Sequence, residues 1–88
     1  MISYFVEFLG TAFLVYIIFA TGNYIAIGTA LAIAVLLGGA VSGGAFNPAV
    51  AISLYASGRI GKIDLGAYIL AEIIGGLVGY FLYQSFVM

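Results

Sequence analysis

The segment from Ser42 to Val50 constrains the fold more than any other part of the chain. It interrupts a long apolar sequence with two glycines, an Asn and the only Pro. Asn is a preferred N-cap residue, and Pro suits the first helical position because its φ is fixed and it has no N–H to leave unpaired. Asn47-Pro48 therefore predicts the start of a helix, preceded by a bend at the glycines.

The helix that starts there is short. The sequence is compatible with a helix from Pro48 to about Ser57, and Gly58 is placed to end it. About ten residues at ~1.5 Å each give ~15 Å of helix, whereas the hydrocarbon core of a bilayer is ~30 Å thick. Such a helix can cross only half of a membrane.

Composition decides whether a membrane is involved. Hydrophobic residues make up 66% of the 88 residues and charged residues 6%, whereas soluble domains carry about 25% charged residues. The chain is therefore expected to be an integral, multi-pass membrane protein with a single domain, residues 1–88. It has no Cys and no His, which excludes disulfides and His- or Cys-based metal sites, and no cofactor or metal is expected. Its two basic residues argue against nucleic acid as a partner.

Three apolar segments, at about residues 2–20, 24–41 and 65–87, are long enough for transmembrane helices. Irregular backbone is not tolerated where it faces lipid, so the bend must be shielded by protein or line a wet cavity. A re-entrant segment over about residues 42–58 meets this requirement, because it dips to mid-membrane as a loop and returns as the half helix. The predicted fold class is an all-α membrane protein with three transmembrane helices and one re-entrant half helix.

The few charges bear on orientation in the membrane. Three spans put the two termini on opposite faces, and Arg59, Lys62 and the N-terminal amine share one face, which the positive-inside rule favours as cytoplasmic. This bias is weak. Asp64 is placed to N-cap the third span. The side chains of Arg59, Lys62 and Asp64 are interpreted as solvated loop charges. Several of the tyrosines lie near predicted span ends, where an interfacial belt is the simplest account; the tyrosines considered are Tyr4, Tyr24, Tyr55, Tyr68, Tyr80 and Tyr83.

Small residues recur every four positions in two of the spans. Such rows let helix backbones approach closely in a membrane, where no hydrophobic force drives helices together. We therefore expect ordinary helix packing along Ala26, Ala30, Ala34 and Gly38, and along Ala71, Gly75 and Gly79.

The inner end of the half helix needs a polar partner. Its free N–H groups and its partial positive charge require either an anion or a water-filled pore. Asn47 suits the pore, because its side-chain oxygen can cap the helix while its NH₂ donates outward. The carbonyls of Gly43, Gly44 and Ala45 would supply acceptors along the approach. The alternative is that Asn47 is a helix cap and nothing more.

Three motifs resemble one known family in the same order and separation. Residues 42–50, Ser-Gly-Gly-Ala-Phe-Asn-Pro-Ala-Val, resemble the Asn-Pro-Ala signature loop of the aquaporin and aquaglyceroporin (major intrinsic protein) family. Residues 7–11, Glu-Phe-Leu-Gly-Thr, resemble its first-helix motif, and residues 67–76 its third. The resemblance covers nearly the whole chain and makes Asn47, Pro48 and Ala49 the pore motif.

The resemblance also implies a partner. Members of that family carry two inverted repeats, whereas this chain has one Asn-Pro-Ala, and one half helix cannot line a whole pore. Inverted repeats are related by a two-fold axis in the membrane plane. We therefore expect a second copy of the chain in antiparallel orientation, with insertion in both orientations. Four such dimers, eight chains, are a further expectation from the family's four side-by-side pores.

The family's narrow filter can be carried over by spacing from Asn47. Its second-helix positions fall on Ile27 and Val35, and its loop positions on Gly44 and Val50. No Arg occupies these positions, so the resemblance implies an apolar filter. The alternative for Ile27 and Val35 is plain packing on a helix that is apolar all round.

Two carboxylates lie inside predicted spans, where charges are functional candidates by default. Glu7 resembles the family's buried Glu, which accepts hydrogen bonds from the re-entrant loop. The alternative is a carboxylate that reaches water from near a helix end. Glu72 lies at a place where the family often has Gln, Pro or Glu, and we expect it also to support the loop.

The favoured function is a passive channel for water and small uncharged solutes such as glycerol. No nucleophile–base pair or metal cluster can be assembled, so an enzyme is not expected. Two alternatives stay open. One is a proton- or cation-coupled dual-topology transporter that uses Glu72 or Glu7, and the other is a structural half protein without a pore of its own.

Overall fold

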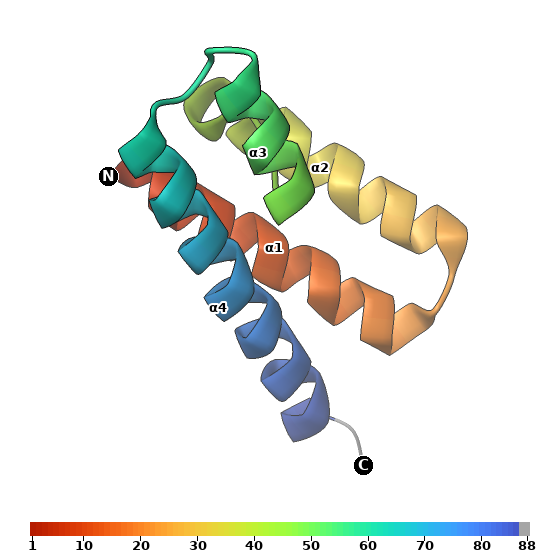
Figure 1. The fold of residues 1–88 in the computed structure, drawn as a ribbon. Helices are drawn as coiled ribbons and strands as arrows, with labels where there is room; N and C mark the ends of the chain where they lie inside the picture. The colour runs from red at the N-terminus through yellow and green to blue at the C-terminus, as the bar shows by residue number, and fades with distance from the viewer. Residues whose placement is uncertain (87–88) are drawn as a thin grey trace.

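The structure is a computed structural model that describes residues 1–86, and this part of the chain folds into four helices (Figure 1). They are α1 (Ile2–Thr21), α2 (Tyr24–Ser42), α3 (Pro48–Ala56) and α4 (Lys62–Phe86). Three of them, α1, α2 and α4, are long and apolar enough to cross a membrane. The nine residues of α3 give a helix of about 14 Å. The predicted all-α fold class, with three long helices and one half helix, is confirmed, and the chain is an integral multi-pass membrane protein.

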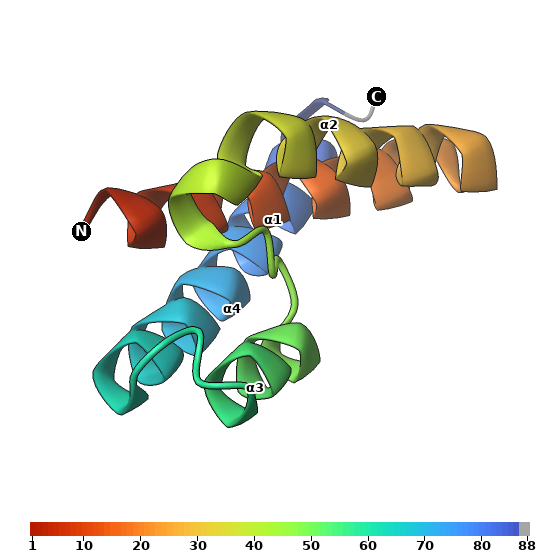
Figure 2. The same ribbon diagram turned by 90° about the horizontal axis from the view of Figure 1, so that it is seen from above.

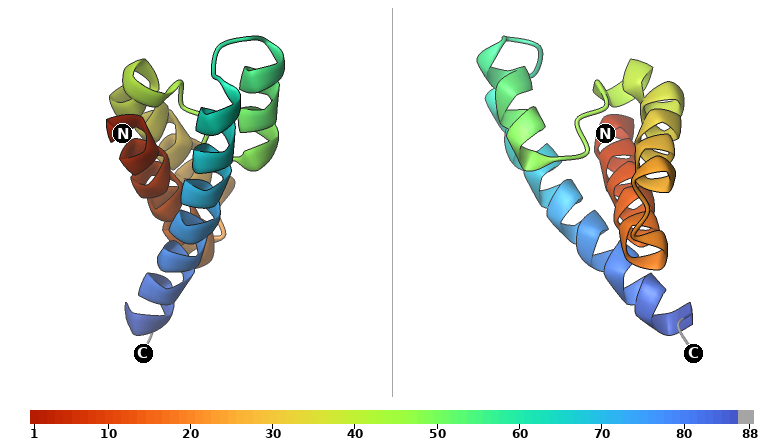
Figure 3. Two further views of the ribbon diagram at one scale, coloured as in Figure 1. Left: turned by 60° about the vertical axis from the view of Figure 1, so that its left-hand side comes forward. Right: turned by 90° about the vertical axis from the view of Figure 1, so that its right-hand side faces the viewer.

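Helix α1 is the centre of the packing. It contacts both α2 and α4, whereas α3 packs against α4. Helices α1 and α2 run antiparallel, and α4 crosses α1 at an angle (Figures 1 and 3). In the right-hand view of Figure 3, the start of α4 stands apart from the α1–α2 pair, beside α3, and its C-terminal end lies close to the pair. Seen from above, the segment that links α2 to α3 runs between the α1–α2 pair on one side and α3 with the start of α4 on the other (Figure 2). The start of α1 and the far end of α4 lie at opposite ends of the molecule (Figure 1).

The crossing of α1 and α4 depends on two glycines. A Cβ on Gly75 would overlap the carbonyl oxygen of Phe8, and a Cβ on Gly79 would overlap that of Ala12. Only hydrogen fits at these two positions, so the two backbones come into direct contact. The small-residue row of the third span thus packs against the first helix, as expected for close approach in a membrane.

Local signals explain most helix ends. The side chain of Asn23 caps α2 by accepting hydrogen bonds from the N–H groups of Ile25 and Ala26, each at 3.0 Å. Helix α3 ends at Ala56, where Gly58 adopts a φ of +83°. The N–H of Arg59 then donates to the carbonyl of Leu54 at 2.9 Å, the pattern of a glycine-terminated helix.

The start of α4 differs from the sequence-based expectation. The helix begins at Lys62, three residues before Leu65, so Asp64 lies in its first turn and is not the N-cap. Nor is Asp64 a solvated loop charge, because the Tyr4 hydroxyl donates to it at 2.6 Å. A carboxylate is favourable in this turn, where the helix N-terminus carries partial positive charge. Residue 87, the expected end of the span, lies outside the described residues.

Candidate functional site

The loop between α2 and α3 is built on two glycines with left-handed backbone. Gly43 and Gly44 have φ values of +87° and +67°, a region that side-chain-bearing residues rarely adopt. Gly43 is the C-cap of α2, and its N–H donates to the carbonyl of Gly39 at 2.8 Å. These residues turn the chain from the end of α2 back into the molecule.

Phe46 anchors the far side of the loop. It has a φ of +53°, uncommon for a bulky residue, and only 3% of its surface is exposed. Its ring fills the space where a Cβ on Gly10 would be, and it also faces Gly38 of α2. The glycine of the first-helix motif therefore makes room for the loop. Sequence analysis did not identify Phe46, although its place before Asn47 within an apolar run was a usable signal.

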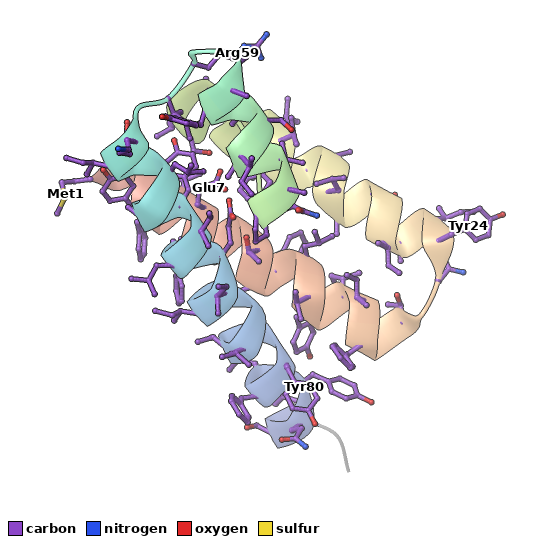
Figure 4. The ribbon with its side chains drawn as sticks, viewed as in Figure 1. Met1, Glu7, Tyr24, Arg59 and Tyr80 are labelled. Atoms are coloured by element: carbon purple, nitrogen blue, oxygen red, sulfur yellow. The ribbon has the colours of Figure 1, made fainter. Side chains whose placement is uncertain are left out.

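The carboxylate of Glu7 holds this loop. It is completely buried and lies on α1, between α3 and α4 in the view of Figure 4. Its Oε2 accepts from the Ser42 hydroxyl at 2.6 Å and from the N–H of Ala45 at 3.2 Å, and its Oε1 accepts from the N–H of Phe46 at 2.8 Å. One carboxylate thus satisfies two backbone donors that have no helical partner. Because Glu7 is buried, the alternative of a carboxylate that reaches water from near a helix end does not describe it.

Tyr68 and Ser42 form a second support that sequence analysis missed. The Tyr68 hydroxyl donates to the carbonyl of Ser42 at 2.7 Å, and the N–H of Gly44 donates to the Ser42 hydroxyl oxygen at 3.2 Å. Tyr68 is 3% exposed, so it does not belong to an interfacial belt. Tyr4 packs edge-on against its ring, with 5.9 Å between the centroids.

Asn47 caps α3 with its side chain. Its Oδ1 accepts from the N–H of Ala49 at 2.7 Å, and Pro48 occupies the first helical position. Asn47 is exposed, and its Nδ2 makes no hydrogen bond within residues 1–86. The amide therefore presents two donor hydrogens at the inner end of the half helix.

Backbone acceptors lie next to this donor. The carbonyls of Gly43, Gly44 and Ala45 accept no backbone hydrogen bond among the described residues. Ser42 and Gly43 also border a polar cavity of about 400 Å³ that Arg59, Asp64 and Tyr68 help to line. The loop thus combines a free amide donor with free carbonyls, a set that can hydrogen-bond water or a hydroxyl.

The four proposed filter positions are only partly brought together. A Cβ on Gly44 would lie 3.4 Å from the side chain of Val35, so these two positions are adjacent. Val35 and Val50 are each about two-fifths exposed. Ile27 precedes Val35 by eight residues, about 12 Å along the helix axis, and lies toward the other end of α2. The filter role of all four residues stays a prediction.

Glu72 is the second buried carboxyl. It is 2% exposed, and neither of its oxygens has a hydrogen-bond partner among the described residues. Glu7 is opposite it across the α1–α4 contact, because Thr11 and Gly76, each four residues further along its helix, face each other. Within residues 1–86, no group of three or more potential metal ligands comes together.

Comparison with known proteins agrees with this geometry. The family model described as "Major intrinsic protein" matches residues 21–88, which is most of the chain. The chain belongs to the major intrinsic protein family. No solved structure was found to match it.

Several curated relatives within the major intrinsic protein family are similar to the chain. It is 40% identical over 96 residues to glycerol uptake facilitator protein-like 6 of Lactiplantibacillus plantarum, which covers 99% of this chain and 44% of the relative. It is 40% identical over 57 residues to the aquaglyceroporin AqpS of Rhizobium meliloti, a match that covers 65% of this chain and 24% of the relative. It is 48% identical over 40 residues to aquaporin Z of Photorhabdus laumondii, a match that covers 46% of this chain and 17% of the relative. The chain therefore spans less than half the length of these relatives.

Proposed function

We propose that the chain is one half of a passive channel for water and small uncharged solutes, and that a second, antiparallel copy completes the pore. The observation that carries the proposal is the inner end of α3. There an exposed Asn47 amide lies next to free loop carbonyls, on a helix of about 14 Å. Half the ~30 Å thickness of a bilayer core is then left without a polar lining.

The packing of α3 supports a missing partner. Among the helices of residues 1–86, α3 contacts α4 alone. Only Ala51 and Leu54 of its nine residues are buried. The remaining flank carries exposed apolar side chains, including Val50 and Ile52. A second copy would cover this flank and place its own half helix in the empty half of the pore.

An antiparallel arrangement fits the electrostatics of a neutral-solute channel. Each half helix directs its partially positive N-terminus toward mid-membrane. Two such ends facing each other oppose the passage of protons and other cations. The relative named as a glycerol uptake facilitator is consistent with an uncharged solute. Four such dimers side by side would be an assembly of eight chains in the lipid bilayer.

The test is stopped-flow shrinkage of proteoliposomes that contain only this chain. Water permeability above that of empty liposomes is expected for the native sequence, and Asn47→Asp should change it, because this substitution replaces the exposed donor with a charge. Asn23→Asp is the matched control, since Asn23 also caps a helix but lies at the turn between α1 and α2.

The outcomes separate three hypotheses. Permeability altered by Asn47→Asp and not by Asn23→Asp supports a pore lined by Asn47. Background permeability from well-folded protein means that identical halves do not form a pore, as expected for a structural half protein. Equal effects of the two substitutions would contradict a special role for Asn47.

A proton-coupled carrier is the second candidate function, favoured by the buried Glu72 carboxyl without partners. In that case, Glu72→Gln would abolish solute flux driven by a pH gradient, while Asn47→Asp would leave it largely intact. A passive pore predicts the opposite pattern, with flux that does not require a pH gradient.

A further inference from the structure

The interface between α1 and α4 contains polar atoms that the pore does not use. Both carboxyl oxygens of Glu72 and the hydroxyl of Thr11 are buried without hydrogen-bond partners among the described residues. Thr11 lies one turn after Glu7, and its methyl group faces Gly76, one turn after Glu72. Unpartnered buried polar groups are rare in folded proteins and call for an explanation.

The two neighbouring carboxyls have opposite surroundings. Glu7 accepts three hydrogen bonds, from Ser42, Ala45 and Phe46, which suit an ionised carboxylate. Glu72 accepts none from the residues that the structure describes. An ionised carboxylate with no donor in an apolar interior is costly, and a second negative charge beside it raises that cost.

A hydrogen-bond count of Glu7 leaves room for one more donor. An ionised carboxylate offers about four acceptor positions, and the loop occupies three of them. The register of the α1–α4 contact places Glu72 opposite Glu7, because Thr11 faces Gly76 one turn further along both helices. The vacant position can be filled by an O–H group, and Glu72 supplies one only when it carries a proton.

We propose that Glu72 is a proton-binding site: it is held as a neutral carboxylic acid at neutral pH, and its O–H donates to the Glu7 carboxylate. The two carboxyl groups then share one proton and carry one negative charge. The proton helps to hold the loop, because it forms the hydrogen bond from Glu72 to Glu7. Glu72 is thus a positioning residue that acts on the loop through Glu7. This inference does not depend on whether the chain conducts.

The other titratable groups around the pair leave it isolated. On α4, Tyr68 lies close enough to interact with both carboxyls, and its hydroxyl donates to Ser42. Asp64 and Tyr4, from α4 and α1, are bonded to each other near Tyr68. The titratable residue of α2 is Tyr24, at its far end, and that of α3 is Tyr55, in its last turn. The basic residues Arg59 and Lys62 are both exposed, and Lys62 lies at the start of α4, ten residues before Glu72.

Infrared spectroscopy of the purified chain in lipid tests the proposal directly. At neutral pH an ordinary Glu is ionised, so a carbonyl band from a protonated carboxylic acid is expected only from Glu72. The band should be present in the native sequence and absent in Glu72→Gln. Asp64→Asn is the matched carboxyl control and should leave it, and Thr11→Val, which removes the other unpartnered oxygen, should leave it as well.

A second measurement does not require the variants to fold equally well. Titration of the native protein to alkaline pH should remove the band. The thermal unfolding temperature should fall as pH rises above the ordinary Glu range and level off where the band disappears, because the unfolded chain gives up the Glu72 proton first. Glu72→Gln keeps a donor toward Glu7, and its unfolding temperature should be insensitive to this titration.

Three results would overturn the proposal. The first is the absence of a protonated-carboxyl band from the native protein at neutral pH, which means that Glu72 is ionised. The second is a band that disappears in Asp64→Asn, which assigns it to another carboxyl. The third is stabilisation by sodium ions that Glu72→Gln abolishes, which means that a metal cation and not a proton occupies the site.

Discussion

Glu7 joins three residues that are far from it in the chain and close to it in space. Ser42, Ala45 and Phe46 all donate to its carboxylate, across 35 to 39 positions of sequence. A neutral amide cannot replace this group, because it offers one acceptor oxygen and turns a donor toward donors.

We predict that Glu7→Gln destabilises the chain by about 1–3 kcal/mol, the cost of leaving a buried donor unsatisfied. Thermal or denaturant unfolding in detergent, followed by circular dichroism, measures this loss. Ser53→Ala is the control, since it removes a hydrogen bond from an exposed hydroxyl. Equal stabilities of the two variants would show that the loop does not depend on the Glu7 carboxylate.

Some of the residue-level site was predictable from sequence and some was not. Asn47 and Pro48 could be assigned because capping is local: the Asn47 side chain bonds an N–H two residues away. Tyr68 could not, because its hydroxyl bonds a carbonyl 26 residues away and nothing near it in sequence marks the contact. Phe46 is an intermediate case: its place before Asn47 marks it in the sequence, but the space it fills is created by Gly10 on another helix.

At the scale of elements, the glycine contact between α1 and α4 determines how closely these two helices approach each other. We predict that Gly75→Ala destabilises the fold by about 1–3 kcal/mol, because its methyl group would overlap the backbone of Phe8 and force the helices apart. Gly66→Ala is the matched control on the same helix, where a Cβ meets nothing within 4 Å. Unfolding of both variants in detergent checks the prediction, which fails if Gly75→Ala is as stable as Gly66→Ala.

Element ends followed sequence signals unevenly. The ends of α3 were predictable to within about a residue because Asn47, Pro48 and Gly58 mark them locally. The start of α4 was predicted too late, because Asp64 was interpreted as a cap. Its carboxylate instead bonds Tyr4, a residue 60 positions away. A tertiary contact thus determined the role of a residue whose local signal pointed elsewhere.

At the scale of the whole molecule, the central question is the orientation of the chain in the membrane. The sequence contains no Cys, so single-cysteine variants report one site without background. We predict that Gly61→Cys, in the loop before α4, and Thr21→Cys, at the end of α1, are each labelled in part by an impermeant reagent in intact cells, and that the remainder is labelled only after permeabilisation. An antiparallel homodimer needs both orientations, so labelling of each site from one side alone would contradict it.

The half-length α3 has a further consequence for a pore made from two copies of one chain. A two-fold axis in the membrane plane makes the two entrances identical, so the passage has no inherent inward or outward direction. Solute should cross equally fast either way under equal and opposite gradients. Any single substitution also appears twice, once in each half of the pore. Such a channel cannot acquire rectification by mutation unless its two copies first become different sequences.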